Sequence, residues 1–209
     1  MLQKVLIHAF FLIFTLIGCS ADQERLADTG STSVDTSAVV AEGQSITADA
    51  FQTLSSNLMG AMQEGGFEYA LQFCKVEALP LTDSLSTHYG VDLRRATHRP
   101  RNPINRADSL EMETIRHYIA QINNQEQPAP VVHRSDDQLI YHAPIVINNG
   151  MCLNCHGDTG SEIQQERLEM IRNLYPNDEA TGFDMGDLRG IWSIEFPESF
   201  FKSDDLSSD

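Results

Sequence analysis

The sequence predicts an α+β domain built around a small antiparallel sheet, and three observations lead to that fold class. Apolar residues recur at helical spacing through the first half of the domain. Later segments alternate apolar and polar residues with the period of a strand. These strand segments are separated by further helical segments rather than forming one continuous block. Helices followed by strands that helices divide are typical of an α+β domain and not of an all-helical one.

The first element, residues 1–18, has the pattern of a lipoprotein signal peptide. Its single charge is Lys4, and the apolar run that follows is too short to span a bilayer as a helix. The run ends in Leu16-Ile17-Gly18-Cys19, which resembles a bacterial lipobox and implies cleavage before Cys19 and lipidation of that residue. Ser20 follows, where Asp would be the inner-membrane signal. The expectation is therefore a chain anchored on the periplasmic side of a bacterial membrane, with the outer membrane favoured. An ordinary signal peptide is the alternative.

Residues 19–44 are expected to be a flexible tether. They are rich in Ser, Thr, Asp, Ala and Gly and contain almost no large apolar side chain. The folded domain is expected over residues 45–201, and residues 202–209 form a polar tail. The length of the domain suffices for one hydrophobic core.

Two helices are expected at the start of the domain. The first covers residues 47–64, where apolar residues recur at helical spacing, and Gly65-Gly66 ends it. The second covers residues 67–88 and is bent or interrupted near Pro80, because proline lacks the amide hydrogen that a helix interior needs.

Two further helices are expected later in the chain. Asp108 with Glu111 three residues on is a capping box and opens a helix over residues 108–124. The last helix covers residues 161–174 and is ended by Pro176.

The strands are expected in three places. Residues 91–97 form a short strand, followed by a proline-containing loop. Residues 131–134 and 138–147 flank Asp136-Asp137 and are predicted to form a hairpin. Residues 188–196 alternate as a last strand.

The strongest functional signal is Cys152-Leu153-Asn154-Cys155-His156. C-x-x-C-H is the attachment motif of c-type haem: two thiols add to the haem vinyl groups, and the histidine binds the iron. A zinc site is an alternative, but zinc normally takes four ligands in paired clusters, and the sequence has no second C-x-x-C. A redox dithiol is another alternative, but it does not require the following histidine. Haem c is assembled outside the cytoplasm, which agrees with the predicted export.

Cys74 is the cysteine that neither the lipid nor the haem attachment uses. It lies in an apolar helical pattern, so one interpretation is a small buried hydrophobic residue. The other is a thiolate on the haem iron, opposite His156, which would lower the reduction potential. Methionine and histidine are the commoner sixth ligands of electron-transfer haems, so the sequence pattern alone leaves both interpretations open.

Several segments together resemble a known family. They are Phe73-Cys74-Lys75 and residues 93–97, 101–105, 151–157, 174–182 and 186–190. In this order they resemble the single-haem c-type domain family with a PAS-like fold, over residues 45–197. That family occurs alone and as the sensor part of bacterial signalling proteins. The resemblance implies a PAS-like fold with N-terminal helices and a haem loop. It also implies that His156 is the fifth ligand of the iron and Cys74 the sixth.

Basic residues and charge indicate further contacts. Arg94, Arg95 and Arg101 belong to the densest basic cluster in an acidic chain and are candidates to bind the haem propionates; the alternative is that they balance surface acids. The net charge of −16 excludes nucleic-acid binding through counterion release. It would also repel anionic lipid, which leaves membrane attachment to the anchor at Cys19. A positively charged redox or signalling protein is a possible partner.

Function is predicted from the haem motif and the anchor together. The leading hypothesis is an exported, lipid-anchored haem protein that acts in redox or gas sensing or in electron transfer. A peroxidase-like enzyme is an alternative, with His142 as its distal acid–base residue. His142 is also an alternative to Cys74 as the sixth ligand of the iron. The other interpretation of His142 and of His133 is a strand histidine that faces solvent or a propionate. An interaction lipoprotein with a structural haem is a third hypothesis. No nucleophile motif or carboxylate pair favours an enzyme.

Overall fold

The computed structural model describes residues 35–135, 138–197 and 199–201. The predicted signal peptide, the lipidation site Cys19, most of the predicted tether and the polar tail lie outside these residues. In the described part of the chain, no helix is both long enough and apolar enough to cross a membrane.

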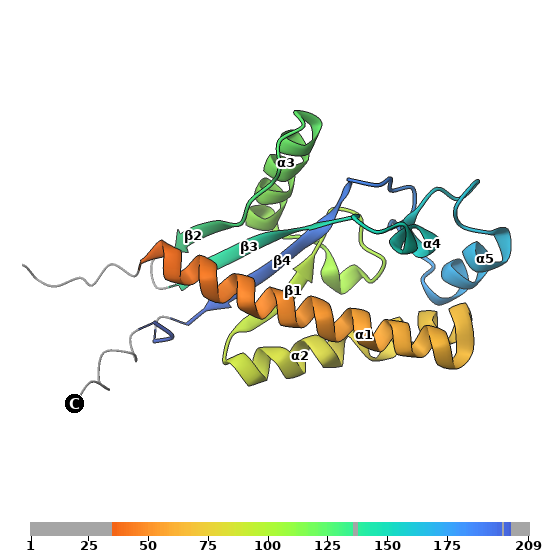
Figure 1. The fold of residues 1–209 in the computed structure, drawn as a ribbon, viewed down its shortest axis with the longest axis horizontal. Helices are drawn as coiled ribbons and strands as arrows, with labels where there is room; N and C mark the ends of the chain where they lie inside the picture. Colours follow the sequence, from red (N-terminus) through yellow and green to blue (C-terminus); the bar gives the residue numbers. More distant parts are fainter. Residues whose placement is uncertain (1–34, 136–137, 198, 202–209) are drawn as a thin grey trace, which may run out of the picture. The chain divides into compact units, whose positions relative to one another are not determined.

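A four-stranded antiparallel sheet forms the centre of the domain, in the order β1-β4-β3-β2 (Figure 1). The strands are β1 (Asp92–Ala96), β2 (Val131–Ser135), β3 (Gln138–Val146) and β4 (Leu188–Phe196). The hairpin and the last strand lie where the sequence predicts them. Helices pack on this sheet, and the predicted α+β class is confirmed.

One face of the sheet is covered by the long helix α1 (Thr36–Val76). Alternate residues of β1, β3 and β4 point to this face, as the period of a strand requires. Their core with α1 contains Val39, Ile46, Ala50, Leu93, Leu139, Tyr141, Trp192, Ile194 and Phe196. Figure 1 shows α1 running along the sheet, on the side opposite α3.

Helix α1 begins earlier than the sequence predicts. Asp35 caps it by accepting a hydrogen bond of 2.9 Å from the Ser37 amide, so residues 36–44, predicted as tether, are helical. The physical reason is packing. Gly43 lies so close to Tyr141 that a Cβ atom there would be 2.6 Å from the aromatic ring. Small residues therefore let the helix approach the sheet closely, although their composition resembles that of a tether.

Two predicted irregularities occur in the helical region. Gly65 and Gly66 kink α1, and Gly66 has a φ of +69°, which favours glycine. The second interruption falls at Glu77, where α1 ends and α2 (Ala78–Tyr89) begins. Pro80 explains it, because a proline ring clashes with the carbonyl group four residues earlier, at Val76.

The opposite face of the sheet is covered by α3 (Ser109–Asn123). The predicted capping box is present: Asp108 accepts from the Glu111 amide at 2.8 Å, and Glu111 accepts from the Asp108 amide at 2.9 Å. The core on this face contains Ala96, Ile115, Tyr118, Leu188 and Ile191.

Short helices lie between the hairpin and β4. They are η2 (Gly150–Cys152), α4 (Leu153–His156) and α5 (Gln165–Leu174), and η1 (Pro103–Asn105) lies in the loop after β1. Helix α5 begins four residues later than the predicted residue 161, because the Ser161 amide bonds to Asp158 in a tight turn instead. Helix α5 packs against the last turns of α1.

Candidate functional site

The C-x-x-C-H motif occupies two short helical turns after β3. Cys152 ends η2, which Asn149 caps by accepting from the Met151 amide at 2.9 Å. Cys155 and His156 lie on α4. Leu153, between the two cysteines, is buried in a small core with Ile147, Ala180 and Phe183. This core fixes the turn, and both motif thiols are half-buried and free of disulfides.

The imidazole of His156 is held by one hydrogen bond. Its Nδ1 lies 2.7 Å from the carbonyl oxygen of Ala180. Because a carbonyl oxygen only accepts, Nδ1 carries the proton and Nε2 keeps its lone pair. Burial, and then the positive charges of Arg189 and Arg101, lower the pKa of His156 well below its ordinary value. The ring is therefore neutral at physiological pH, which is the form that binds metals.

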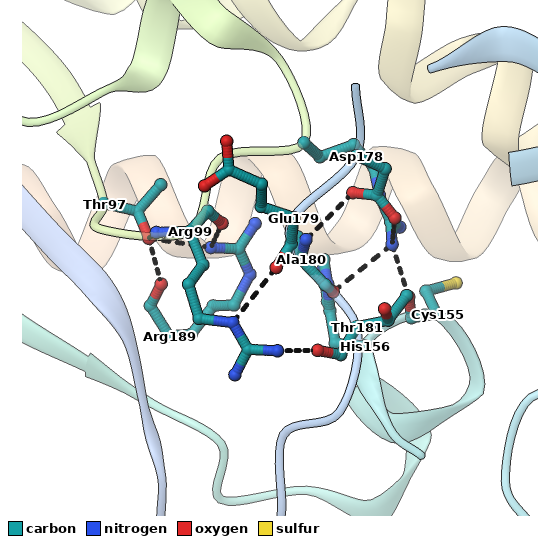
Figure 2. A network of polar contacts seen from close by, with 10 residues as sticks. Thr97, Arg99, Cys155, His156, Asp178, Glu179, Ala180, Thr181 and Arg189 are labelled. Carbon is teal, nitrogen blue, oxygen red and sulfur yellow. Dashed lines mark hydrogen bonds and ion pairs between the residues drawn. The ribbon is translucent and has the colours of Figure 1, made fainter. Parts of the chain in front are cut away.

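Arg101 ties the motif to the segment that supplies this carbonyl. Its guanidinium forms a fork with Asp178 at 3.0 and 3.1 Å. It also donates to the carbonyl oxygens of Cys155 at 2.6 Å and Ala180 at 3.3 Å (Figure 2). Both side chains of this ion pair are almost fully buried. Arg101 thus contacts both Cys155 and Ala180, the residue whose carbonyl oxygen accepts from His156.

A second group of contacts continues this network toward the sheet. Arg99 donates to the carbonyl oxygens of Glu179 at 3.0 Å and Gly182 at 3.2 Å, and to that of Thr181. Arg189 donates to the Thr97 hydroxyl at 3.0 Å. Figure 2 shows these side chains around the segment from Asp178 to Thr181. The loop facing His156 is therefore held by Arg99, and Arg189 of β4 contacts Thr97 and the Arg99 carbonyl beside it.

Cys74 lies on the last turns of α1, where α5 packs. Burial raises the pKa of Cys155 to about 11, and a negative charge at nearby Cys74 adds to that rise. Burial raises the pKa of Cys74 itself, while the positive charges of Arg95 and Arg101 oppose that rise. The structure therefore brings Cys74, Cys155 and two of the three predicted arginines into one region.

The predicted arginine set is divided between two faces of the sheet. Arg94 and Arg95 are successive residues of β1 and point to opposite sides. Arg94 pairs with Glu111 of α3 at 2.9 Å. Arg95 points to the α1 side, and its charge acts on Cys74 and Tyr175. Arg101 is at the motif, but Asp178 already neutralises its charge.

His142 lies elsewhere than predicted, whereas His133 is half-buried. His142 is fully buried against α3, and its Nδ1 lies 2.8 Å from the Thr114 hydroxyl. The same hydroxyl lies 3.0 Å from Nε2 of His133. The expectation of a solvent- or propionate-facing His142 is therefore wrong, because its strand register turns the side chain toward α3. The distal role of a peroxidase-like site has no support from this position.

Two features of the site escape sequence reasoning. Arg189 belongs to the segment 186–190 that carries the family resemblance, yet it stands apart in sequence from the basic cluster. The Ala180 carbonyl has no side-chain signal.

The zinc alternative requires a ligand cluster, and among residues 35–135, 138–197 and 199–201 no three His, Cys, Asp or Glu side chains gather as a metal-ligand group.

Fold and site together define a class: a haem-motif loop carried at the end of a helix-covered antiparallel sheet. The chain belongs to the Tll0287-like family, whose model matches residues 23–197. It is similar in fold to the crystal structure of the cyanobacterial haem protein Tll0287, with a TM-score of 0.52 and 22% sequence identity. The match covers 75% of this chain and 96% of that chain. No curated protein sequence matches. The family resemblance seen in the sequence is thereby confirmed.

Proposed function

We propose that this chain is a c-type haem protein in which Cys152 and Cys155 form the two thioether bonds and His156 binds the iron through Nε2. The hydrogen bond from His156 Nδ1 to the Ala180 carbonyl carries the proposal. A histidine that ligates a metal almost always donates its other ring N–H to such an acceptor, which sets the tautomer and the ring orientation. Here that second contact is already in place.

The surrounding residues fit a covalently held haem. The thiols of Cys152 and Cys155 are free. Arg101 fixes the backbone of Cys155, and the core around Leu153 fixes the turn between the thiols. When bound, haem supplies a one-electron redox centre whose potential depends on its axial ligands. The role of the chain is to hold the ring edge and one axial face in a fixed relation.

Cys74 is proposed as the second axial ligand. Its support is the family resemblance and its position, since charge at Cys74 acts on Cys155 and the cations Arg95 and Arg101 favour the thiolate. A thiolate ligand donates charge to iron and lowers the potential.

The cellular setting is proposed from the sequence. The leader and Cys19 support export and lipid anchoring on the periplasmic side of a bacterial membrane, with the outer membrane favoured. In that setting the protein acts in redox or gas sensing or in electron transfer, with a redox or signalling protein as partner. Fast electron exchange with a periplasmic donor supports the carrier role, and binding of micromolar CO or NO supports the sensor role.

The test is expression with a haem-maturation system, followed by a pyridine haemochrome spectrum. We expect one covalent haem per chain, lost when Cys152→Ala and Cys155→Ala are combined. Cys74→Ala is the matched cysteine variant: it should keep covalent haem but lose the low-spin ferric signal of the wild type in electron paramagnetic resonance. Wild-type protein without covalent haem would refute the c-type proposal, whereas an unchanged signal in Cys74→Ala would refute only the assignment of that ligand.

A further inference from the structure

The region around the haem motif holds more positive than negative charge. The pKa of Arg189 is lowered to about 9, by burial first and then by the nearby charges of Arg101 and Arg95, with a smaller effect of Arg99. Asp178 is the carboxylate that opposes them. Three guanidinium groups and one carboxylate therefore act on Arg189, which leaves cations in excess around it. Such an excess in a partly buried region is costly unless anions join it.

The four arginines differ in how their donors are used. Arg101 forms an ion pair with Asp178, and Arg99 is directed onto the carbonyls of residues 179, 181 and 182. Both therefore hold protein structure. Arg189, in contrast, has a buried Nε without a partner, and its Nη1 donates to Thr97 and to the Arg99 carbonyl at 3.2 Å.

Arg95 is the least satisfied of the four. Within the described part of the chain it makes no hydrogen bond and no ion pair. It is nevertheless only partly exposed. A charged donor that is shielded from water and has no acceptor is costly. Arg95 and the Nε of Arg189 thus have no protein acceptor, whereas Arg99 and Arg101 direct their guanidinium groups onto protein carbonyls and a carboxylate.

The charges of Arg95 and Arg189 act on the two residues that are proposed as iron ligands. The charge of Arg189 acts strongly on His156, and its guanidinium lies 5.3 Å from the ring of Phe183, which contacts His156 edge-on. The charge of Arg95 acts on Cys74. They come from the strands β4 and β1, whereas the thiols that hold the ring come from η2 and α4.

We propose that Arg95 and Arg189 bind the two propionate groups of the haem, while Arg94 and Arg101 do not. The inference rests on the proposed haem binding. Haem carries two carboxylates on the part of the ring away from the thioether-bound vinyl positions, and guanidinium forks match carboxylates in shape and charge. The propionates also supply negative charge to a region in which cations are in excess.

The test compares single glutamine variants of the maturated holoprotein. Arg95→Gln and Arg189→Gln are expected to keep covalent haem but to leave one propionate unneutralised. The oxidised-to-reduced ratio at a fixed electrode potential should then rise about threefold to tenfold, and the propionate bending band in resonance Raman spectra should move. Arg94→Gln is the matched control and should leave both readouts at wild-type values. Wild-type potential and Raman band in both Arg95→Gln and Arg189→Gln would overturn the assignment.

Three further measurements keep the outcomes separate. Arg95→Lys and Arg189→Lys retain the charge but not the fork, so they should move the Raman band while changing the potential less than the glutamine variants. Inorganic phosphate tests whether the cations bind a free anion instead: a shift of the wild-type potential on adding phosphate would contradict occupation by propionates. In the haem-free Cys152→Ala/Cys155→Ala protein, Arg189→Gln should raise or leave unchanged the thermal midpoint, and a clear loss there would show a structural role instead. Failure of haem binding itself appears separately, as a wild-type protein without a haemochrome spectrum.

Discussion

Arg94 and Arg95 are neighbours on β1, yet the two faces of the sheet treat them differently. Arg94 meets Glu111 on the α3 face, and that carboxylate also closes the capping box of the helix. Arg95 faces the α1 side, where the described residues provide it with no acceptor. The α3 face is thus internally neutral, whereas the haem-motif region keeps an excess of positive charge. The comparison teaches that one face pairs its arginine within the protein, whereas the other leaves an arginine available to an anion.

The polar residues buried under α3 also contact one another, although Nε2 of His142 is buried without a partner. Thr114 lies between the two histidines, and Tyr118 donates to the His142 carbonyl at 3.0 Å. The ring of His133 is 4.9 Å from that of His142. A group so enclosed contributes to stability and to its pH dependence rather than to ligand binding.

The largest expected effect on this face is the pH dependence caused by His142. Burial, and then the charge of His133, lower its pKa to about 4, while Asp108 has a smaller opposing effect. An unfolded histidine titrates near 6.5. As the pH falls, the histidine of the unfolded chain binds a proton before the buried histidine of the folded chain does. The stability that is present above pH ~6.5 is therefore lost progressively until the pH reaches ~4. The loss is about 3 kcal/mol.

Urea unfolding between pH 7 and pH 4 measures this loss. His142→Gln should reduce the stability lost between pH 7 and pH 4 by about 3 kcal/mol. The contribution of His156, whose pKa burial also lowers, should remain. His117→Gln, on the exposed side of α3, is the matched control and should keep the wild-type slope. An equal slope in the wild type and His142→Gln would show that the histidine is not held neutral inside this face.

The second prediction breaks the neutral face at its ion pair. Glu111 is 2% exposed, and Glu111→Ala removes the partner of Arg94 together with one arm of the capping box. We expect a loss of about 2–3 kcal/mol in the free energy of unfolding, with haem content unchanged. Glu113→Ala, an exposed position on the same helix, should cost less than about 0.5 kcal/mol. Equal stability of the two variants in urea unfolding would contradict the packing described here.

Much of the frame could be predicted from local sequence rules. The capping box at Asp108 and the strand β4 follow from short-range chemistry and period, and they were found where expected. The face to which Arg94 and Arg95 point depends on strand register, which a list of basic residues does not contain. The Ala180 carbonyl could not be foreseen either, because every residue has one and only the tertiary fold brings it to His156.

The start of α1 was missed for a related reason. Val39 and Gly43 lie in a segment whose overall composition of Ser, Thr, Asp, Ala and Gly resembles that of a tether. In the fold they form a narrow stripe that packs on β3, so their small size is the signal. The composition of a segment indicates how readily it is buried. How closely a helix can approach a sheet depends instead on the shapes of both surfaces, and the sequence of the helix does not give the shape of the sheet.

The smallest predicted effect tests this close approach with two glycines of α1. A Cβ atom at Gly43 would lie 2.6 Å from the ring of Tyr141, which is fully buried and has no room to move. Gly43→Ala should therefore lower stability by about 1–2 kcal/mol, the cost of overpacking less the gain in helix propensity. At Gly60 nothing lies within 4 Å, so Gly60→Ala should raise stability by about 0.5–1 kcal/mol. The two stability changes, measured by urea unfolding, should have opposite signs because Gly43, unlike Gly60, lies against the sheet. A gain in both variants would mean that the N-terminal part of α1 does not pack on β3. The α1 face would then lack the fixed wall against which the second half of the helix presents Cys74.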